Sequence, residues 1–226
     1  MAATRRTVVF AKRPEAGRVK TRLAPVLGPE RAAELAAAML ADLVDRLASR
    51  DDLAPGIAYA PEGAEPWFRE RFPDAALYAQ EGDGLAARMQ CFFEQRASAA
   101  PDETVVILGA DAPLASLDAI AAAHAELEGG VDVVLGPDEG GGYWLLGLRG
   151  PAPEVFGVTM STRGMCAETV DAVRAAGRRV ALVARGFDVD VPDDLRRLRD
   201  EIAALDRRAP GYPRRTADFL AQHPTT

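Results

Sequence analysis

The sequence predicts an α/β fold, a three-layer α/β/α sandwich built around a mostly parallel sheet. Short β-rich runs alternate along the chain with segments of helical periodicity, which is the pattern of such folds. Several β-rich runs are apolar throughout, as expected for strands that helices cover on both faces. The expected strands span residues 7–12, 56–60, 76–79, 104–110, 131–135, 143–148 and 180–184. Because no repeat or linker interrupts them, we expect one domain over residues 1–226.

Helical patterns fill the segments between these strands. The expected helices span residues 29–48, 84–97, 116–127, 162–176, 193–206 and 214–222. The first carries an apolar residue at every fourth position, at Leu35, Met39, Leu43 and Leu47. Pro29 suits a first turn, Ser116 suits an N-cap, and Gly177 suits the position after a helix end. Asp193 and Asp194 favour a helix start through the helix dipole.

Composition limits the partners and the compartment that we expect. A net charge of −7 disfavours nucleic acid as a partner. The two cysteines, Cys91 and Cys166, have neither disulfide-framework nor zinc-site spacing, so we expect a reducing, cytoplasmic setting. No run approaches the roughly 20 apolar residues that span a bilayer, and no apolar segment precedes the first strand, so we expect neither a membrane partner nor a signal peptide. The alanine-rich helices 29–48 and 116–127 could form a homodimer face or equally pack on the sheet.

A cation-rich loop follows the first expected strand, although the chain as a whole is acidic. The residues that could bind a nucleotide here are Lys12, Arg13, Gly17, Lys20 and Arg22. Lysine and arginine neutralise phosphate oxygens, and glycine allows a positive φ or a close approach to a ligand. The loop has neither a GxxxxGK[ST] nor a GxGxxG pattern. The alternative interpretation is a solvated cationic turn.

Aspartates follow two later strands, at the edge of the sheet where ligands bind in such folds. Asp111 comes directly after the strand at 104–110, and Asp188 and Asp190 alternate in an extended segment, so that their carboxylates point to one side. Such charges repel each other unless a cation lies between them, and Mg²⁺ (or Mn²⁺) is a hard cation that suits oxygen ligands. The alternatives are that Asp111 only forms a turn and that Asp190 and Asp193 only cap the following helix.

Two further loops supply candidates for binding an acceptor or a base. The acceptor candidates are Gly141, Gly142, Tyr143, Ser161 and Thr162. The glycines could instead form a tight bend, Tyr143 could belong to the core, and Ser161 and Thr162 are interpreted first as helix caps. Gly82 precedes a helix whose N-terminus could face an anion or a base, with Arg88 one turn further on, although an ordinary turn with a surface arginine is as good an interpretation. Asp138 and Glu139 could orient a hydroxyl or support the metal.

Four segments occur together in an order that resembles a known family. The segments are FAKRPEAGRVKTRLAPVLG, GADAP, GPDEGGGYWLLGL and DVDVPDDL. Over residues 7–200 the chain resembles small GT-A-fold proteins of the nucleotide-diphospho-sugar transferase superfamily, and it is also similar to phospholactate guanylyltransferase. The resemblance implies a nucleotide site with phosphate-binding cations at Lys12, Lys20 and Arg22. It also implies metal-binding aspartates at Asp111, Asp188 and Asp190.

The chain departs from this family pattern in three places. Gly140 stands where an aspartate is expected before two glycines, Ala86 follows Leu85 where the family has glycine, and Thr159-Met160 replaces Pro-Trp. All three lie in segments that we expect to touch a base or an acceptor, so they affect specificity. The metal set and the cationic loop are unchanged.

Three functional hypotheses follow. The first is nucleotidyl transfer from a nucleoside triphosphate to a small phosphate-bearing acceptor with release of pyrophosphate, with Lys20 and Asp111 as the catalytic residues. The cation-dense loop favours it, because a leaving pyrophosphate needs several positive partners. The second is glycosyl transfer from a nucleotide-sugar, and the third is a non-catalytic nucleotide-binding module. The partners expected are therefore a nucleotide or nucleotide-sugar and a small-molecule acceptor.

Overall fold

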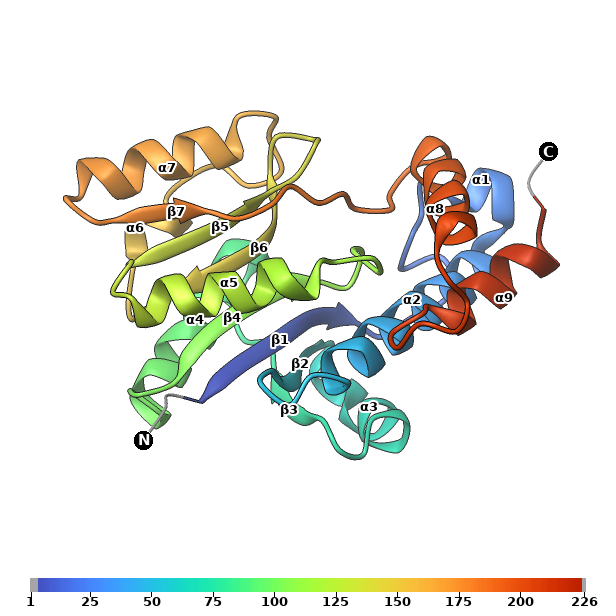
Figure 1. The fold of residues 1–226 in the computed structure, drawn as a ribbon, viewed down its shortest axis with the longest axis horizontal. Coiled ribbons are helices and arrows are strands. Elements are labelled where there is room, and N and C mark those ends of the chain that lie inside the picture. The colour runs from blue at the N-terminus through green and yellow to red at the C-terminus, as the bar shows by residue number, and fades with distance from the viewer. Residues whose placement is uncertain (1–3, 225–226) are drawn as a thin grey trace.

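The computed structural model describes residues 4–224 and has a seven-stranded mixed sheet in the order β3-β2-β1-β4-β6-β5-β7 (Figure 1). The strands are β1 (Arg5–Lys12), β2 (Ala54–Ala60), β3 (Ala76–Ala79), β4 (Thr104–Gly109), β5 (Val133–Pro137), β6 (Tyr143–Leu148) and β7 (Val180–Leu182). Only β6 pairs antiparallel, with β4 and with β5, and the other pairings of these strands are parallel. The predicted α/β class and mostly parallel sheet are confirmed.

The six expected helices are present, although α7 begins later than expected. The helices are α1 (Ala24–Leu27), α2 (Pro29–Ala48), α3 (Glu65–Arg71), α4 (Gly84–Ala99), α5 (Leu117–Glu128), α6 (Pro153–Phe156), α7 (Met165–Ala175), α8 (Pro192–Ala204) and α9 (Arg214–Gln222). Sequence periodicity did not predict α1, α3 or α6, or the 3₁₀ turn Glu62–Ala64. Each spans too few turns to show a helical repeat.

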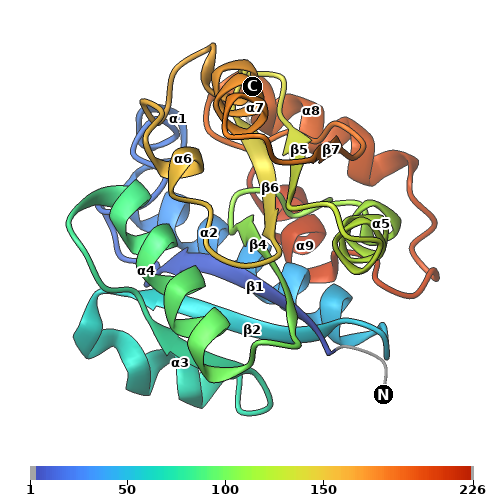
Figure 2. The ribbon, with the colours of Figure 1, turned by 90° about the vertical axis from the view of Figure 1, so that its left-hand side faces the viewer.

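Helices cover both faces of the sheet (Figure 2). Helices α2, α3 and α5 pack on one face, against side chains such as Val9 and Val106. Helices α4, α6 and α7 pack on the other, against Val8 and Ile107, as the alternation along a strand requires. The apolar residues of α2 and α5 in the first of these two clusters thus pack on the sheet. Among the described residues, no helix is long and apolar enough to cross a membrane.

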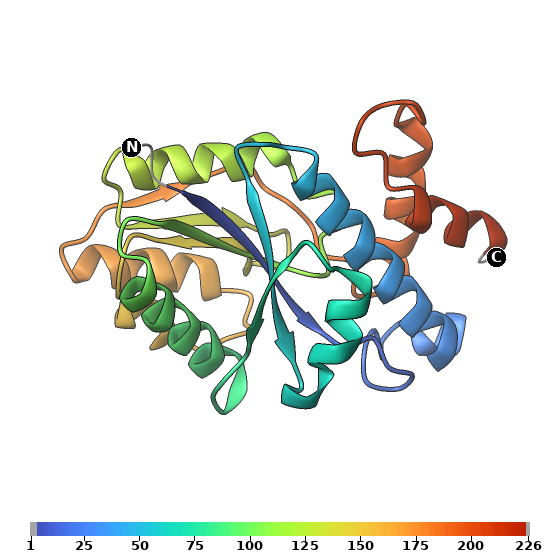
Figure 3. The same cartoon turned by 90° about the horizontal axis from the view of Figure 1, so that it is seen from below.

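A third hydrophobic cluster lies beyond one edge of the sandwich, where α1, α8 and α9 gather around the N-terminal half of α2 (Figures 1 and 3). Leu35 and Met39 of α2 are fully buried in it. The carboxylate of Asp42 ties α9 to α2, because it accepts hydrogen bonds from the backbone N–H groups of Arg215 (3.2 Å) and Thr216 (2.7 Å). These groups are unpaired donors at the start of a helix, so Asp42 caps α9 from a distant part of the chain.

A histidine with no exposed surface joins α5 to the sheet. His124 Nε2 lies 3.0 Å from Thr7 Oγ1 on β1, and His124 Nδ1 lies 2.8 Å from Thr104 Oγ1 on β4. Burial, and next the positive charge of Arg5, lowers the pKa of His124 to about 4, while Glu128 and Asp52 act weakly in the opposite direction. The imidazole of His124 is therefore uncharged in the folded protein at neutral pH.

We predict that this histidine makes stability depend on pH. A pKa of about 4 in the folded protein lies below the value of 6.5 for the free side chain, so between these values the unfolded chain binds more protons. The free energy of unfolding should therefore fall as pH drops from 6.5 to 4, by up to about 3 kcal/mol from this group. Urea unfolding of the wild type and of His124→Gln across this range isolates the effect. Parallel pH profiles for the two proteins would contradict it.

Candidate functional site

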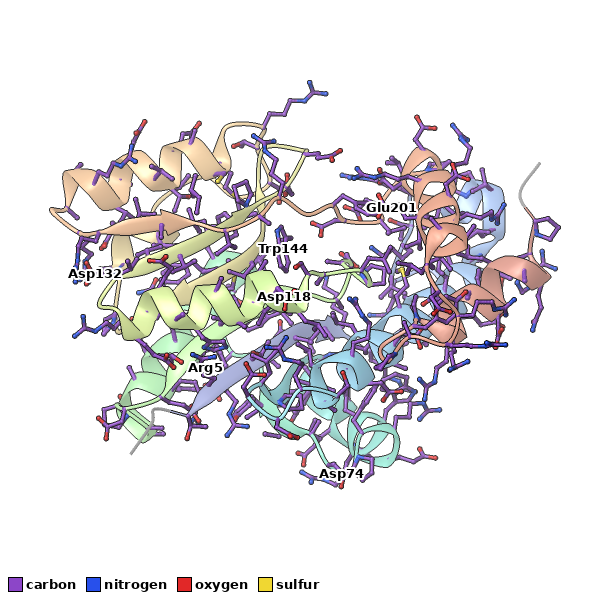
Figure 4. The ribbon with its side chains drawn as sticks, in the orientation of Figure 1. Arg5, Asp74, Asp118, Asp132, Trp144 and Glu201 are labelled. Atoms are coloured by element: carbon purple, nitrogen blue, oxygen red, sulfur yellow. The ribbon has the colours of Figure 1, made fainter. Side chains whose placement is uncertain are left out.

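The candidate site lies at the carboxyl edge of the parallel strands. In Figure 4, Trp144 on β6 marks this end of the sheet and Arg5 marks the opposite end of β1. The segment after β7 runs along the edge, because Gly186 N donates to Pro137 O (3.1 Å) and Val189 N donates to Asp111 O (2.9 Å). Asp188 is therefore held between the ends of β5 and β4.

A buried lysine joins two aspartates at this edge. Lys20 Nζ lies 2.5 Å from Asp111 Oδ1 and 3.0 Å from Asp190 Oδ1. The Lys20 side chain is only 4% exposed, whereas the two carboxylates are nearly half exposed. Burial opposes the charged form of Lys20, but Asp111 and Asp190 outweigh it and raise the pKa of the ammonium. The backbone of Lys20 has a φ of 47°, in the left-handed region that residues other than glycine rarely adopt.

Asp188 faces the same cluster without a partner of its own. Its Oδ1 is buried and accepts no hydrogen bond from the described residues. Burial, followed by the charges of Asp111, Asp138 and Asp190, raises the pKa of Asp188 to about 7, and Lys20 only partly offsets this. Lys20, with Arg22 at 4.0 Å from Asp190, therefore faces four carboxylates, and the edge carries more acidic than basic groups.

The start of α8 fixes the backbone of Asp190. Asp194 Oδ2 accepts hydrogen bonds from the N–H groups of Asp190 and Val191, both at 2.8 Å. The interpretation that Asp190 and Asp193 cap this helix is wrong, because Asp194 caps it and Asp193 pairs with Arg196. The Asp190 side chain is consequently directed to Lys20.

The other cations of the loop after β1 differ in whether they already form ion pairs with carboxylates of the chain. Arg13 and Arg18 both pair with Glu15, at 3.3 and 3.5 Å. Lys12 is exposed and makes no ion pair with the described residues, and Arg22, also exposed, approaches Asp190 only to 4.0 Å. Lys12 and Arg22 are thus the cations most available to an anionic ligand.

Gly17 and Gly82 take the backbone conformations that only glycine adopts easily. Gly17 has a φ of 75°, and a Cβ added to it would meet no atom within 4 Å. Glycine is therefore favoured here by the backbone conformation of the turn and not by a close contact. Gly82 has a φ of 120°, and its carbonyl accepts a hydrogen bond from Arg88 Nε at 3.0 Å. Arg88 therefore closes its own loop in this structure.

The acceptor candidates come from two loops that pack together. Gly141 O accepts a hydrogen bond from Cys166 N at 2.9 Å, and a Cβ on Gly141 would lie 1.8 Å from Arg163 O. Gly142 N donates to Asp138 Oδ1 at 2.9 Å. Only glycine at position 141 allows this contact between the loops.

Three of the acceptor candidates need a changed description. The expected helix at 162–176 begins at Met165, and no side chain caps it, so Ser161 and Thr162 are not caps. Instead Ser161 has a φ of 64°, and the Thr162 hydroxyl donates to Thr159 O at 3.5 Å. Tyr143 packs against the second core and its hydroxyl lies 3.9 Å from Met160 Sδ, in keeping with the core interpretation.

Asp138 has a larger part in the site than its sequence position suggested. Gly140 occupies the position where an aspartate was expected, but Asp138 at the end of β5 acts on Asp188. An isolated β-bridge between Asp138 and Gly186 brings Asp138 beside the segment after β7. The sequence does not show the path of that segment, so this contact could not be predicted from it. The Gly140 departure therefore does not remove the carboxylate from this part of the edge.

The residues fit a divalent cation by charge and donor type. The buried, unpartnered oxygen of Asp188 and the carboxylates of Asp111 and Asp190 are the hard oxygen ligands that Mg²⁺ prefers. Within residues 4–224, however, no three acidic, histidine or cysteine side chains are grouped as metal ligands, and the Lys20 ammonium lies between Asp111 and Asp190. The donors are present, but the space between two of them is taken by a side chain.

Two hollows flank the edge, and the three aspartates line neither. One cavity of about 150 Å³ lies between Trp144, Phe187 and α8, where Arg197 pairs with Glu139 at 2.6 Å. A wider groove of about 490 Å³ lies among α1, α8 and α9. The candidate site is thus an open edge bordered by these hollows.

Solved structures of other proteins share this fold. A protein from Desulfovibrio desulfuricans G20, described as a "putative nucleotide-diphospho-sugar transferase", is 30% identical, with a TM-score of 0.84 and 98% of each chain covered. A 4-diphosphocytidyl-2C-methyl-D-erythritol synthase is 11% identical, with a TM-score of 0.59 over 88% of this chain and 97% of that one. A CMP:2-keto-3-deoxy-manno-octonic acid synthetase, solved with CTP, is 13% identical, with a TM-score of 0.55 over 89% and 99%. The last two show the fold alone.

The fold is therefore that of the nucleotide-diphospho-sugar transferases, shared with nucleotidyltransferases. Residues 43–162 match the family described as "Uncharacterized protein conserved in bacteria (DUF2064)", and the chain belongs to this family. No curated protein matches the sequence.

We predict that Asp188→Asn stabilises the metal-free protein. The substitution removes a buried charge that several carboxylates repel, so the free energy of unfolding at pH 8 should rise by about 1–3 kcal/mol. Thermal and urea unfolding in the presence of a chelator measure the change. Asp193→Asn is the matched control, because Asp193 lies in the same segment but is 80% exposed. A loss of stability in Asp188→Asn would contradict the interpretation that the neighbouring carboxylates repel the charge of Asp188.

Proposed function

We propose that this protein is a metal-dependent transferase that uses a nucleotide-activated donor, and that its reaction is nucleotidyl transfer. The observation that carries the proposal is a cation-rich loop after β1 facing a group of aspartates across the carboxyl edge of the sheet. Ligands of open α/β sheets bind at this edge. A triphosphate placed there has cations on one side and carboxylates with a surplus of negative charge on the other.

Each part of the edge has a proposed task. Lys12 and Arg22 bind phosphate oxygens, Arg22 with its planar fork and Lys12 as a point charge. Asp111, Asp188 and Asp190 would hold Mg²⁺, or Mn²⁺ in its place. The bound cation would neutralise negative charge on the phosphates. Lys20 and Asp111 are the proposed catalytic pair, since they lie where the two groups meet. Arg13, Gly17, Gly82 and Arg88 shape the nucleotide side of the site.

The proposed chemistry needs no protein nucleophile. An oxygen of a phosphate-bearing acceptor forms a bond to the α-phosphorus, and the bond from that phosphorus to the bridging oxygen breaks. Pyrophosphate leaves with the electron pair of the broken bond. Catalysis then consists of positioning and charge stabilisation, which is what phosphoryl-type transfers require. The loops containing Gly141, Gly142, Tyr143, Ser161 and Thr162 are proposed to receive the acceptor.

Glycosyl transfer is the second candidate. The description of the protein from Desulfovibrio desulfuricans G20 favours it, because that protein is similar over nearly the whole chain. In this reaction the acceptor attacks the sugar carbon, and a nucleoside diphosphate leaves. The number of cations near the phosphates favours nucleotidyl transfer, because a free pyrophosphate carries more charge than the diphosphate of a nucleoside. A binding module without activity is the third candidate.

A thermal-shift screen tests the proposal. We expect one nucleoside triphosphate to raise the Tm in the presence of Mg²⁺ or Mn²⁺, because a ligand that binds only the folded state stabilises it by mass action. At a ligand concentration of about 100 times Kd the stabilisation is about 2.7 kcal/mol. Asp188→Ala and Asp190→Ala should lose the shift, and Asp193→Ala should keep it.

The same screen separates the three candidates. Stabilisation by UDP-, GDP- or dTDP-sugars alone would replace nucleotidyl transfer by glycosyl transfer. Stabilisation by a triphosphate that releases no pyrophosphate in the presence of any phosphate-bearing acceptor would favour the binding module. A protein that is folded but responds to none of these nucleotides would overturn the proposal.

A further inference from the structure

Lys20 holds the place between two carboxylates that a divalent cation would need. Its ammonium lies 2.5 Å from Asp111 and 3.0 Å from Asp190. Lys20 and Asp190 are 170 residues apart in the sequence. Both carboxylates are close to half exposed, while the ammonium is buried beneath them. The aspartates are therefore open to solvent on the side away from Lys20, so that an entering cation meets them first.

The choice of lysine at this position is specific to the loop. Of the 27 lysine and arginine residues in the chain, only Lys12 and Lys20 are lysine. An ammonium is a compact point charge on a flexible stem, whereas a guanidinium is a planar fork suited to a fixed bidentate contact. A compact charge on a flexible stem can lie between two single oxygens and can also leave them.

The surroundings favour its departure when an anion and a divalent cation are present. The ammonium carries one positive charge against Asp111, Asp188 and Asp190, and Asp188 Oδ1 has no partner among the described residues. Lys12, at the end of β1 and without an ion pair in the described structure, adds a charge that attracts phosphate to the same edge.

We propose that Lys20 and a divalent cation are alternative occupants of the Asp111–Asp190 pair, so that Lys20 acts as an internal counter-ion that the metal displaces. The released ammonium is then free to contact the phosphates of the donor. Without a nucleotide the metal competes with Lys20 and binds weakly. With a nucleotide, the metal takes the place of Lys20 at the aspartates while the phosphates bind the released ammonium, so that each ligand favours binding of the other. This inference rests on the proposed metal and nucleotide site.

Mg²⁺ binding without nucleotide tests the competition directly. Calorimetric titration should show that Lys20→Met binds Mg²⁺ about tenfold more tightly than the wild type, or more, which corresponds to about 1.4 kcal/mol. Arg18→Met is the control, because Arg18 lies in the same loop, is 78% exposed and pairs with Glu15 rather than with the aspartates. It should bind Mg²⁺ as the wild type does. Unchanged or weaker binding by Lys20→Met overturns the proposal, as does the absence of Mg²⁺ binding in every variant.

Nuclear magnetic resonance of the wild type gives a measurement that does not depend on a folded variant. Because the chain has only two lysines, labelling of lysine Cε gives two signals, and Lys12→Arg identifies which belongs to Lys20. The Lys20 signal should move saturably with Mg²⁺, at the concentrations at which the calorimeter records binding. A Lys20 signal that stays in place while Mg²⁺ binds overturns the proposal. No nucleotide is present, so failure here is distinct from failure of the nucleotide screen.

Discussion

The ion pairs of Lys20 hold together the parts of the chain on which the candidate site depends. Lys20 belongs to the loop after β1, Asp111 to the loop after β4, and Asp190 to the segment that follows β7. A buried ammonium is costly unless it is paired, so each of these three segments is needed to make the position of Lys20 tolerable. The same contacts also make the position sensitive to any new charge that arrives at the edge.

The segment between β7 and α8 is the second requirement. Its backbone hydrogen bonds to Pro137 and Asp111 make it follow the edge of the sheet, and Asp194 fixes the turn from which α8 starts. Helix α8 then packs with α9 and α2 in the third hydrophobic cluster. The hydrogen bonds of Gly186 and Val189 fix the path of the chain on both sides of Asp188. This explains how Asp188 is held at the edge although no strand or helix contains it.

The sequence was enough to predict the layers, the strands and the longer helices, because apolar periodicity depends on burial against the sheet. The buried stripe of Leu35, Met39, Leu43 and Leu47 on α2 is an example. The antiparallel direction of β6 was not predicted, since an apolar strand has the same pattern in either direction. The late start of α7 was missed because Ser161 and Thr162 have cap chemistry but lie in a loop that packs on Gly141.

The candidate residues could be named from the sequence, but their contacts could not. The alternation of Asp188 and Asp190 predicted that both face one cluster, but not that Asp190 pairs with Lys20 while Asp188 Oδ1 is buried without a partner among the described residues. The part played by Asp138 depends on which loop lies beside it, which no local pattern records. Both results arise from contacts between segments that are distant in the sequence.

The contact between Asp42 and the start of α9 has a consequence for how the protein is made. The two lie 174 residues apart, and the Lys20–Asp190 pair spans nearly the same interval. During synthesis the strands from β1 to β4 can pair while the later part of the chain is still missing. The charged edge, by contrast, offers Lys20 only Asp111 until the segment that carries Asp190 has been made, and Asp42 stays without its partners until α9 follows. An incomplete chain can therefore contain much of the sheet, but it cannot contain the site.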